Sequence, residues 1–224
     1  MNEKTNKFCF LGLAFLPFVI LAMESAVVLI ESLFYGTMDF STLNLRTGII
    51  HYSCTMIIWC TGLFGLYILS KKAGYNIYEN KNKPKTINWI IVGIIVIVTA
   101  IGSIIAWEMR FKPFVEFNNF INRFGTIGIM AFIFQYIYYL VESMLFLALI
   151  VFAQEFGERA FKNKIIPWGG IMCGLTWGLV HIFSQNLFTG IYGLILSIFY
   201  GVVYMQLQKN LKYAYIIIAI MFMI

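Results

Sequence analysis

The sequence predicts an all-α protein, a polytopic transmembrane helical bundle of about seven spans. Of its 224 residues, 61% are hydrophobic and only 12% are charged, and the mean hydropathy is +0.83. A soluble domain carries about twice that share of charged residues. Hydrocarbon offers no water to backbone N–H and C=O groups, so long apolar runs must close their own hydrogen bonds as helices. We expect residues 1–224 to form a single integral membrane domain.

Seven apolar runs mark the expected spans. A helix needs about 20 apolar residues to cross the hydrocarbon core of a bilayer, so the short final run predicts a partial span. The runs fall at residues 8–34, 47–70, 87–107, 128–153, 167–187, 188–206 and 211–224.

The lysine and arginine residues between these runs predict the orientation. Cytoplasmic loops carry an excess of positive charge. With the N-terminus in the cytoplasm, the inside set is Lys4, Lys7, Lys71, Lys72, Lys81, Lys83, Lys85, Arg159, Lys162, Lys164, Lys209 and Lys212. The outside set is Arg46, Arg110, Lys112 and Arg123. We therefore expect a multi-pass protein of the cell membrane with a cytoplasmic N-terminus, an outer segment at 108–127 that contains an interfacial helix, and no nucleic-acid partner.

Ionisable residues inside the apolar runs are candidates for function, because charge is costly within a bilayer. Glu24, Glu31 and Glu142 are either hydrogen-bonded core acids or the lining of a polar cavity. His51 opens the second run on the outer side, so we expect it to pack or to lie at the interface. The remaining candidates are Glu155, Glu158, Arg159 and His181.

The segment QEFGERAF, residues 154–161, ends the fourth run. Glu155 and Arg159 are four residues apart, so on a helix they share a face and can form an ion pair. A simpler interpretation is a helix end whose charges lie at the membrane interface.

The segment PWGGIMCGLTWGLVHIF, residues 167–183, contains a glycine at every fourth position. Gly170, Gly174 and Gly178 predict a smooth face against which another helix can pack closely. His181 follows on nearly the same face and is expected to point into the bundle. It is either a core histidine that is hydrogen-bonded across helices or part of a site.

The spacing of these two segments suggests a shared site. Glu155 lies thirteen residues before Trp168, and His181 lies thirteen residues after it. A fold-back around Trp168 would place both residues at a similar depth in the inner leaflet. A carboxylate and an imidazole that meet there could hold a divalent metal or perform acid–base work on a water molecule.

At these segments the chain resembles the CPBP family of intramembrane metalloproteases, which contains the CAAX prenyl endopeptidases and the bacterial Abi-type proteins. The first motif of the family is Glu-Glu-x-x-x-Arg, and here it reads QEFGER at 154–159. The second is an aromatic residue, three residues and a histidine, and here it reads WGLVH at 177–181. The resemblance covers residues 130–224.

The resemblance implies a hydrolase that cleaves membrane-associated or lipidated polypeptides at the cytoplasmic leaflet, with a membrane-bound peptide or protein as its partner. Gln154, Glu155 and Arg159 would be the catalytic positions. Glu155 or Gln154 would lie next to the water, and Arg159 would fix the glutamate. His181 and Glu155 would bind a divalent metal, with zinc the expected ion.

Two features depart from the family pattern. Gln154 replaces the first glutamate, and an amide cannot take a proton from water. The third motif, His-x-x-x-Asn or Asp, has no counterpart, since residues 182–224 hold no histidine. Either Glu155 takes over the base role with further ligands that the motifs do not identify, assisted by Asn186 or Gln185, or proteolysis has been lost. The alternative is an inactive relative that binds a membrane peptide, as a bacteriocin-immunity factor or scaffold. A small transporter or channel is the third hypothesis.

Overall fold

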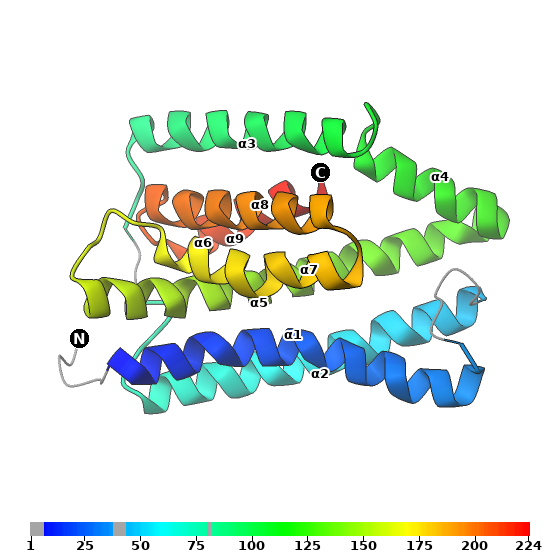
Figure 1. Cartoon of the computed structure of the whole chain (residues 1–224), viewed down its shortest axis with the longest axis horizontal. Helices are drawn as coiled ribbons and strands as arrows, with labels where there is room; N and C mark the ends of the chain where they lie inside the picture. Colours follow the sequence, from blue (N-terminus) through cyan, green and yellow to red (C-terminus); the bar gives the residue numbers. More distant parts are fainter. Residues whose placement is uncertain (1–6, 38–43, 80–81) are drawn as a thin grey trace.

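The chain forms a bundle of helices in the residues that its structure, a computed structural model, describes. These are residues 7–37, 44–79 and 82–224, apart from the side chain of Ser184. They contain no strand, so the predicted all-α fold is confirmed. The elements (Figure 1) are α1 (Lys7–Tyr35), α2 (Leu45–Lys72), α3 (Thr86–Ala106), α4 (Lys112–Phe124), η2 (Gly125–Ile127), α5 (Gly128–Phe161), α6 (Trp168–Cys173), η3 (Gly174–Gly178), α7 (Leu179–Ser184), α8 (Leu187–Gln206) and α9 (Leu211–Met223).

Each predicted apolar run is helical, and five helical segments in the described part of the chain are long and apolar enough to cross a membrane. They are α1, α2, α3, α8 and the run from α4 through α5, whereas α9 and the segment Trp168–Phe183 are shorter. An extended apolar surface on the outside of a bundle is typical of a protein that contacts lipid. Along α3 this surface consists of Ile90, Ile94, Ile97, Ile101 and Ile105.

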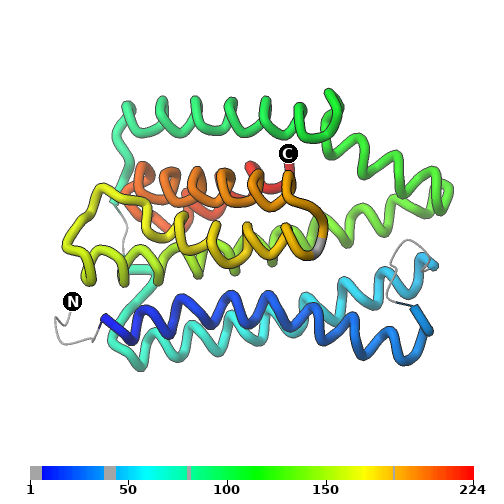
Figure 2. Tube along the Cα trace, viewed as in Figure 1, coloured from blue at the N-terminus to red at the C-terminus, as the bar shows by residue number. Residues whose placement is uncertain are grey.

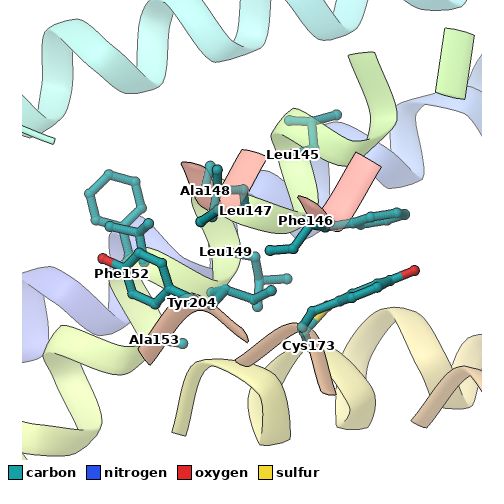
Figure 3. Close-up of a cluster of buried hydrophobic side chains, with 14 of the residues drawn as sticks. Leu145, Phe146, Leu147, Ala148, Leu149, Phe152, Ala153, Cys173 and Tyr204 are labelled. Atoms are coloured by element: carbon teal, nitrogen blue, oxygen red, sulfur yellow. The ribbon is translucent and has the colours of Figure 1, made fainter. Parts of the chain in front are cut away.

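Helix α5 is the central element of the bundle. Figure 1 shows α1 and α2 on one side of α5 and α6 to α9 on the other, and α1 and α2 meet the second group chiefly through α5. Every residue from Leu145 to Ala153 is buried. Figure 3 shows side chains of this stretch packed with Cys173 of α6 and Tyr204 of α8. A segment that is apolar all round suits this enclosed position.

The predicted glycine face packs against α8 of the same chain (Figure 2). A Cβ atom at Gly170 would lie 2.6 Å from the carbonyl oxygen of Ser197. A Cβ atom at Gly178 would lie 2.8 Å from the backbone nitrogen of Leu194. Backbone atoms cannot move aside as a flexible side chain can, so only glycine permits this approach.

The connecting residues 73–79, 82–85, 162–167 and 207–210 lie at one end of the bundle, which we call the lysine-bearing end. The side chain of Asn210 donates to the carbonyl oxygen of Asn82 at 2.9 Å, which joins two of these loops. Most residues of the predicted inside set lie at this end, whereas Lys4 and Lys81 are outside the described residues. The helix expected within 108–127 is α4, near the opposite end.

Candidate functional site

A cavity of about 960 Å³ opens between α1, α2, α5, α7 and α8, and the ends of α3 and α9 complete its wall. It lies in the half of the bundle away from the lysine-bearing end, because the first residues of α8 and the last residues of α9 line it. Its volume is near the upper limit for pockets that hold small molecules. The ionisable residues on its wall are Glu24, His51, Lys112, Glu142 and His181.

Glu142 of α5 contributes a buried carboxylate to the wall of the cavity. Trp177 is hydrogen-bonded to it, and the ring of Trp177 packs against Phe146, one turn along α5, with centroids 4.4 Å apart. No ion pair within 4.0 Å includes Glu142 among the residues that the structure describes. Burial of a carboxylate is costly without a compensating cation. This side chain is therefore a candidate to bind one.

His181 of α7 follows the single π-helical turn η3, and such turns are frequent at functional sites. Its Nδ1 atom lies 2.9 Å from the carbonyl oxygen of Trp177. Because a carbonyl oxygen only accepts, Nδ1 carries the proton. In the neutral ring, Nε2 is then left as an acceptor. His181 can therefore accept a hydrogen bond from a group in the cavity.

Glu24 and Glu31 of α1 flank His51 of α2. The Nδ1 atom of His51 lies 2.7 Å from Oε2 of Glu31, and its Nε2 atom lies 3.5 Å from Oε1 of Glu24. The hydroxyl of Tyr138 donates to Glu24 at 2.7 Å, which joins α5 to this group. These acids were expected either to line a polar cavity or to be hydrogen-bonded in the core. Glu24 lines the cavity, and Glu31 is hydrogen-bonded to a histidine.

Lys112, the lysine on the cavity wall, makes its direct contacts with neutral groups and lies within electrostatic range of Glu116 and Glu142. Its ammonium group donates to the carbonyl oxygen of Phe222 at 2.7 Å. It also lies 4.7 Å from the ring centroid of Tyr139 and 5.0 Å from that of Phe222. Carbonyl and aromatic groups stabilise the ammonium group in this position.

Amide side chains also line the cavity. Gln135 accepts from the hydroxyl of Tyr52 at 3.3 Å. Asn186 caps α8 by accepting from the backbone N–H of Thr189 at 2.9 Å, and it lines the cavity. Gln185 is exposed beside it. The structure thus places both proposed auxiliary ligands next to His181.

Gln154, predicted to be catalytic, is fully buried in α5, two turns before the helix ends. Its NH₂ group donates to the carboxylate of Glu158 at 2.8 Å and to the carbonyl oxygen of Ile166 at 3.0 Å. Its oxygen accepts from the backbone N–H of Gly169 at 3.0 Å. These contacts connect the last turns of α5 with the start of α6. The structure gives Gln154 a role in holding the turn between α5 and α6.

Glu155 and Arg159 form the predicted ion pair, with a separation of 3.4 Å. Lys209 extends it, because its ammonium nitrogen lies 2.6 Å from Glu158 and 3.6 Å from Glu155. The guanidinium group of Arg159 also lies over the ring of Phe10 of α1, 4.3 Å from its centroid. The network links α1, α5 and the loop before α9 at the lysine-bearing end.

Tyr75 lies beside this network, in the loop after α2. It packs against Phe10 and Phe152 with centroid distances of 5.2 Å and 5.9 Å. Burial, and then the negative charge of Glu155, raise the pKa of its phenol. The hydroxyl therefore stays protonated at neutral pH.

Glu155 and His181 are not brought together, so the predicted shared site is wrong. A Cβ atom at Gly157 would lie 2.2 Å from the ring of Trp168, which fixes how α5 and α6 are paired. The contact between Phe146 and Trp177 described above continues the same antiparallel register toward the cavity. His181 consequently lies level with the part of α5 that bears Glu142.

The physical reason is the position of the turn. The prediction placed it around Trp168, whereas the chain reverses over residues 162–167. Glu155 is therefore close to the turn and His181 is far from it. Glu155 and Glu142 are thirteen residues apart, which is about 20 Å along a helix. His51, expected at another depth, lines the same cavity as His181.

The donor set does not fit a catalytic zinc centre, which has three protein ligands. His181 lies on the cavity wall, and Glu155 is paired with Arg159 and Lys209 elsewhere. Across the described ranges, no three His, Cys, Asp or Glu side chains form a group that could hold a metal ion.

Sequence reasoning left Glu142 without a role, although it is an acid within the long apolar run 128–153. Its position as an acid within an apolar run was the feature of the sequence that could have indicated a functional role. Its partner Trp177 could not be aligned with it, because the register between α5 and η3 depends on where the intervening turn lies.

The two motif segments lie in different parts of the molecule. Residues 154–159 are at the lysine-bearing end, and residues 177–181 border the cavity. The resemblance to the CPBP family rests on these segments. Comparison of the chain with family models, with curated proteins and with solved structures found no match.

Proposed function

We propose that this protein is an integral membrane protein that binds a positively charged segment of a membrane-associated polypeptide in the cavity beside Glu142. The observation that carries the proposal is a buried carboxylate on the wall of a large cavity, without an ion-pair partner among the described residues. Ionised groups within a membrane bundle need a partner because their desolvation is costly. An ammonium or guanidinium group of a ligand would supply that partner.

The rest of the lining supports a charged polypeptide over a bare ion. Tyr138, Tyr139 and Trp177 line the cavity, and aromatic side chains can stabilise a cation. Gln185 and Asn186 carry side-chain amides, which both donate and accept as a peptide group does. The cavity therefore suits a charged side chain together with the backbone that bears it.

The proposed location is the cell membrane, with the N-terminus in the cytoplasm. Helix α1 begins at the lysine-bearing end, and the positive-inside rule assigns that end to the cytoplasm. The cavity would then lie in the outer half of the bilayer, and the polypeptide would reach it from that side.

The hydrolytic function implied by the CPBP resemblance has less support. The three hydrogen bonds of Gln154 join α5, the following turn and the start of α6, and Glu155 is paired outside the cavity. The cavity does combine Glu142 with His181. Cleavage of a bound polypeptide is therefore measured in the same experiment.

The test uses purified protein in phosphatidylcholine nanodiscs and a fluorescent amphipathic peptide of leucine and lysine. We expect saturable binding by fluorescence anisotropy, and none of a matched peptide with glutamate in place of lysine. Hydrogen bonds to charged groups contribute about 1.5–3 kcal/mol, so Glu142→Gln should weaken binding at least about tenfold.

Glu108→Gln is the matched control, because Glu108 is exposed and pairs with Arg110 away from the cavity. It should bind the peptide as the wild type does. Equal affinities of the wild type and Glu142→Gln would contradict the proposal. Peptide fragments detected by mass spectrometry with the wild type, but not with His181→Ala, would assign hydrolysis instead.

A further inference from the structure

A second concavity, a groove of about 470 Å³, lies between α2, α5 and α9. It shares no lining residue with the cavity beside Glu142. Its apolar surface comes mainly from three helices: Leu63 and Leu66 of α2, Met144, Leu147, Ala148 and Phe152 of α5, and Leu211 of α9. A polar ligand would gain little from such a surface.

The groove becomes polar at one end, where it reaches the lysine-bearing end of the bundle. Ser70, Tyr78 and Lys212 line it there. The ring of Tyr67, also in the lining, packs edge-on against Tyr78 with centroids 5.7 Å apart. The ammonium group of Lys71 lies 4.8 Å from the centroid of Tyr67. The groove is therefore amphipathic along its length.

Two lysines belong to this polar mouth: Lys212 lines it, and Lys71 lies over the ring of Tyr67, which lines it. Lys71 and Lys212 are exposed, and no carboxylate lies within 4.0 Å of either among the described residues. Lys209, one turn before Lys212, is instead paired with Glu158 at 2.6 Å. The mouth thus offers two cations to an anion from outside the chain.

The dimensions of the groove match one leaflet. Met144 and Phe152 are eight residues apart on α5, which is about 12 Å at 1.5 Å per residue. One leaflet of hydrocarbon is about 15 Å deep, half of a core of about 30 Å. Basic pockets between membrane helices on the cytoplasmic side favour anionic lipid head groups.

We propose that this groove binds an anionic phospholipid, with one acyl chain along α5 and the phosphate between Lys71 and Lys212. The inference rests on the membrane embedding proposed above and is independent of peptide binding in the cavity. A failure of the peptide experiment therefore leaves it standing.

Native mass spectrometry of the full chain in detergent tests the site, with phosphatidylglycerol and phosphatidylcholine of identical acyl chains. We expect the wild type to prefer phosphatidylglycerol. Since each basic residue near an anionic surface contributes about 1 kcal/mol, the double variant Lys71→Gln/Lys212→Gln should bind phosphatidylglycerol roughly thirtyfold more weakly. Its binding of phosphatidylcholine should not change. The control Lys162→Gln/Lys164→Gln removes two exposed lysines of another loop and should retain the preference.

A second variant tests the acyl chain without touching the charges. Met144→Trp narrows the groove from its exposed edge and should reduce binding of both lipids, whereas Ile133→Trp, on the outside of the same helix, should not. Equal binding of the two lipids by the wild type, or an unchanged preference in the double variant, would overturn the proposal. Displacement of the lipid by glycerol phosphate alone would also overturn the proposal, because it would show that the acyl chain does not contribute to binding.

Discussion

The side chain of Gln154 hydrogen-bonds to three groups: Glu158 in α5, Ile166 in the following turn and Gly169 at the start of α6. Restoring the glutamate of the CPBP motif would remove both N–H donors and place a second carboxylate beside Glu158. Buried groups left without partners cost about 1–3 kcal/mol each, and charged ones cost more. We therefore expect Gln154→Glu to lower the free energy of unfolding by about 3 kcal/mol and to create no proteolytic activity.

Thermal unfolding in detergent measures this difference. Gln185→Glu makes the same chemical change at an exposed position and should leave the midpoint of unfolding nearly unchanged. A Gln154→Glu variant that is as stable as the wild type, or that cleaves a peptide, would contradict the role assigned to Gln154.

At the scale of single residues, the sequence could predict neighbours along a helix but not across helices. The pair Glu155–Arg159 was predictable because both residues lie on one helix, four positions apart. The environment of Glu142 depends on Trp177, thirty-five residues away. No local pattern records such a contact, since it depends on how two helices are aligned.

At the scale of elements, the packing of α6 against α8 depends on glycine. We expect Gly170→Ala to destabilise the protein by about 1–3 kcal/mol, because the added Cβ would overlap backbone atoms of α8. The midpoint of thermal unfolding in detergent checks this expectation.

Gly93→Ala is the matched control for this prediction, since nothing lies within 4 Å of the Cβ it would add on α3. Alanine favours helix over glycine by about 1 kcal/mol, so this variant should be as stable as the wild type or slightly more stable. If the two variants changed stability equally, the close packing of α6 and α8 would not be the cause.

The helices themselves were predictable, because all but α4 lie in apolar runs of the sequence and α4 lies in the segment 108–127, where an interfacial helix was expected. The connection at residues 162–167 was not predictable, and it sets the register in which α6, η3 and α7 pack against α5. It is held by contacts that involve Trp168, whose Nε1–H donates to the carbonyl oxygen of Asn163 at 3.0 Å and whose ring stacks on Phe161. The π turn η3 was likewise not predictable, because Gly170, Gly174 and Gly178 keep a spacing of four residues through it.

At the scale of the whole molecule, the distribution of lysines predicts the direction of insertion. A fluorescent protein inserted within residues 162–167 should fold in the cytoplasm, because that loop is at the lysine-bearing end. The same reporter within residues 107–111 should be exported and remain dark. Fluorescence in the reverse pattern would show that the orientation is inverted.

The central position of α5 divides the bundle into two groups of helices, and the cavity and the groove both lie where these groups approach each other without close packing. Composition predicted that the chain would form a membrane bundle. It could not predict this division, because every span is apolar and any of them could have been enclosed.

The pairing of charges between α1 and α2 has a consequence for biosynthesis. Helix α2 ends at Lys72 and α5 begins at Gly128, 56 residues later (128 − 72). At about 5–20 residues per second, the ribosome takes between about 3 and 11 seconds to make that stretch. During that time α1 and α2 are in the membrane without α5, the helix against which both of them pack. The contacts of His51 with Glu31 and Glu24 join α1 to α2 only, so these three ionisable side chains have partners before α5 is synthesised.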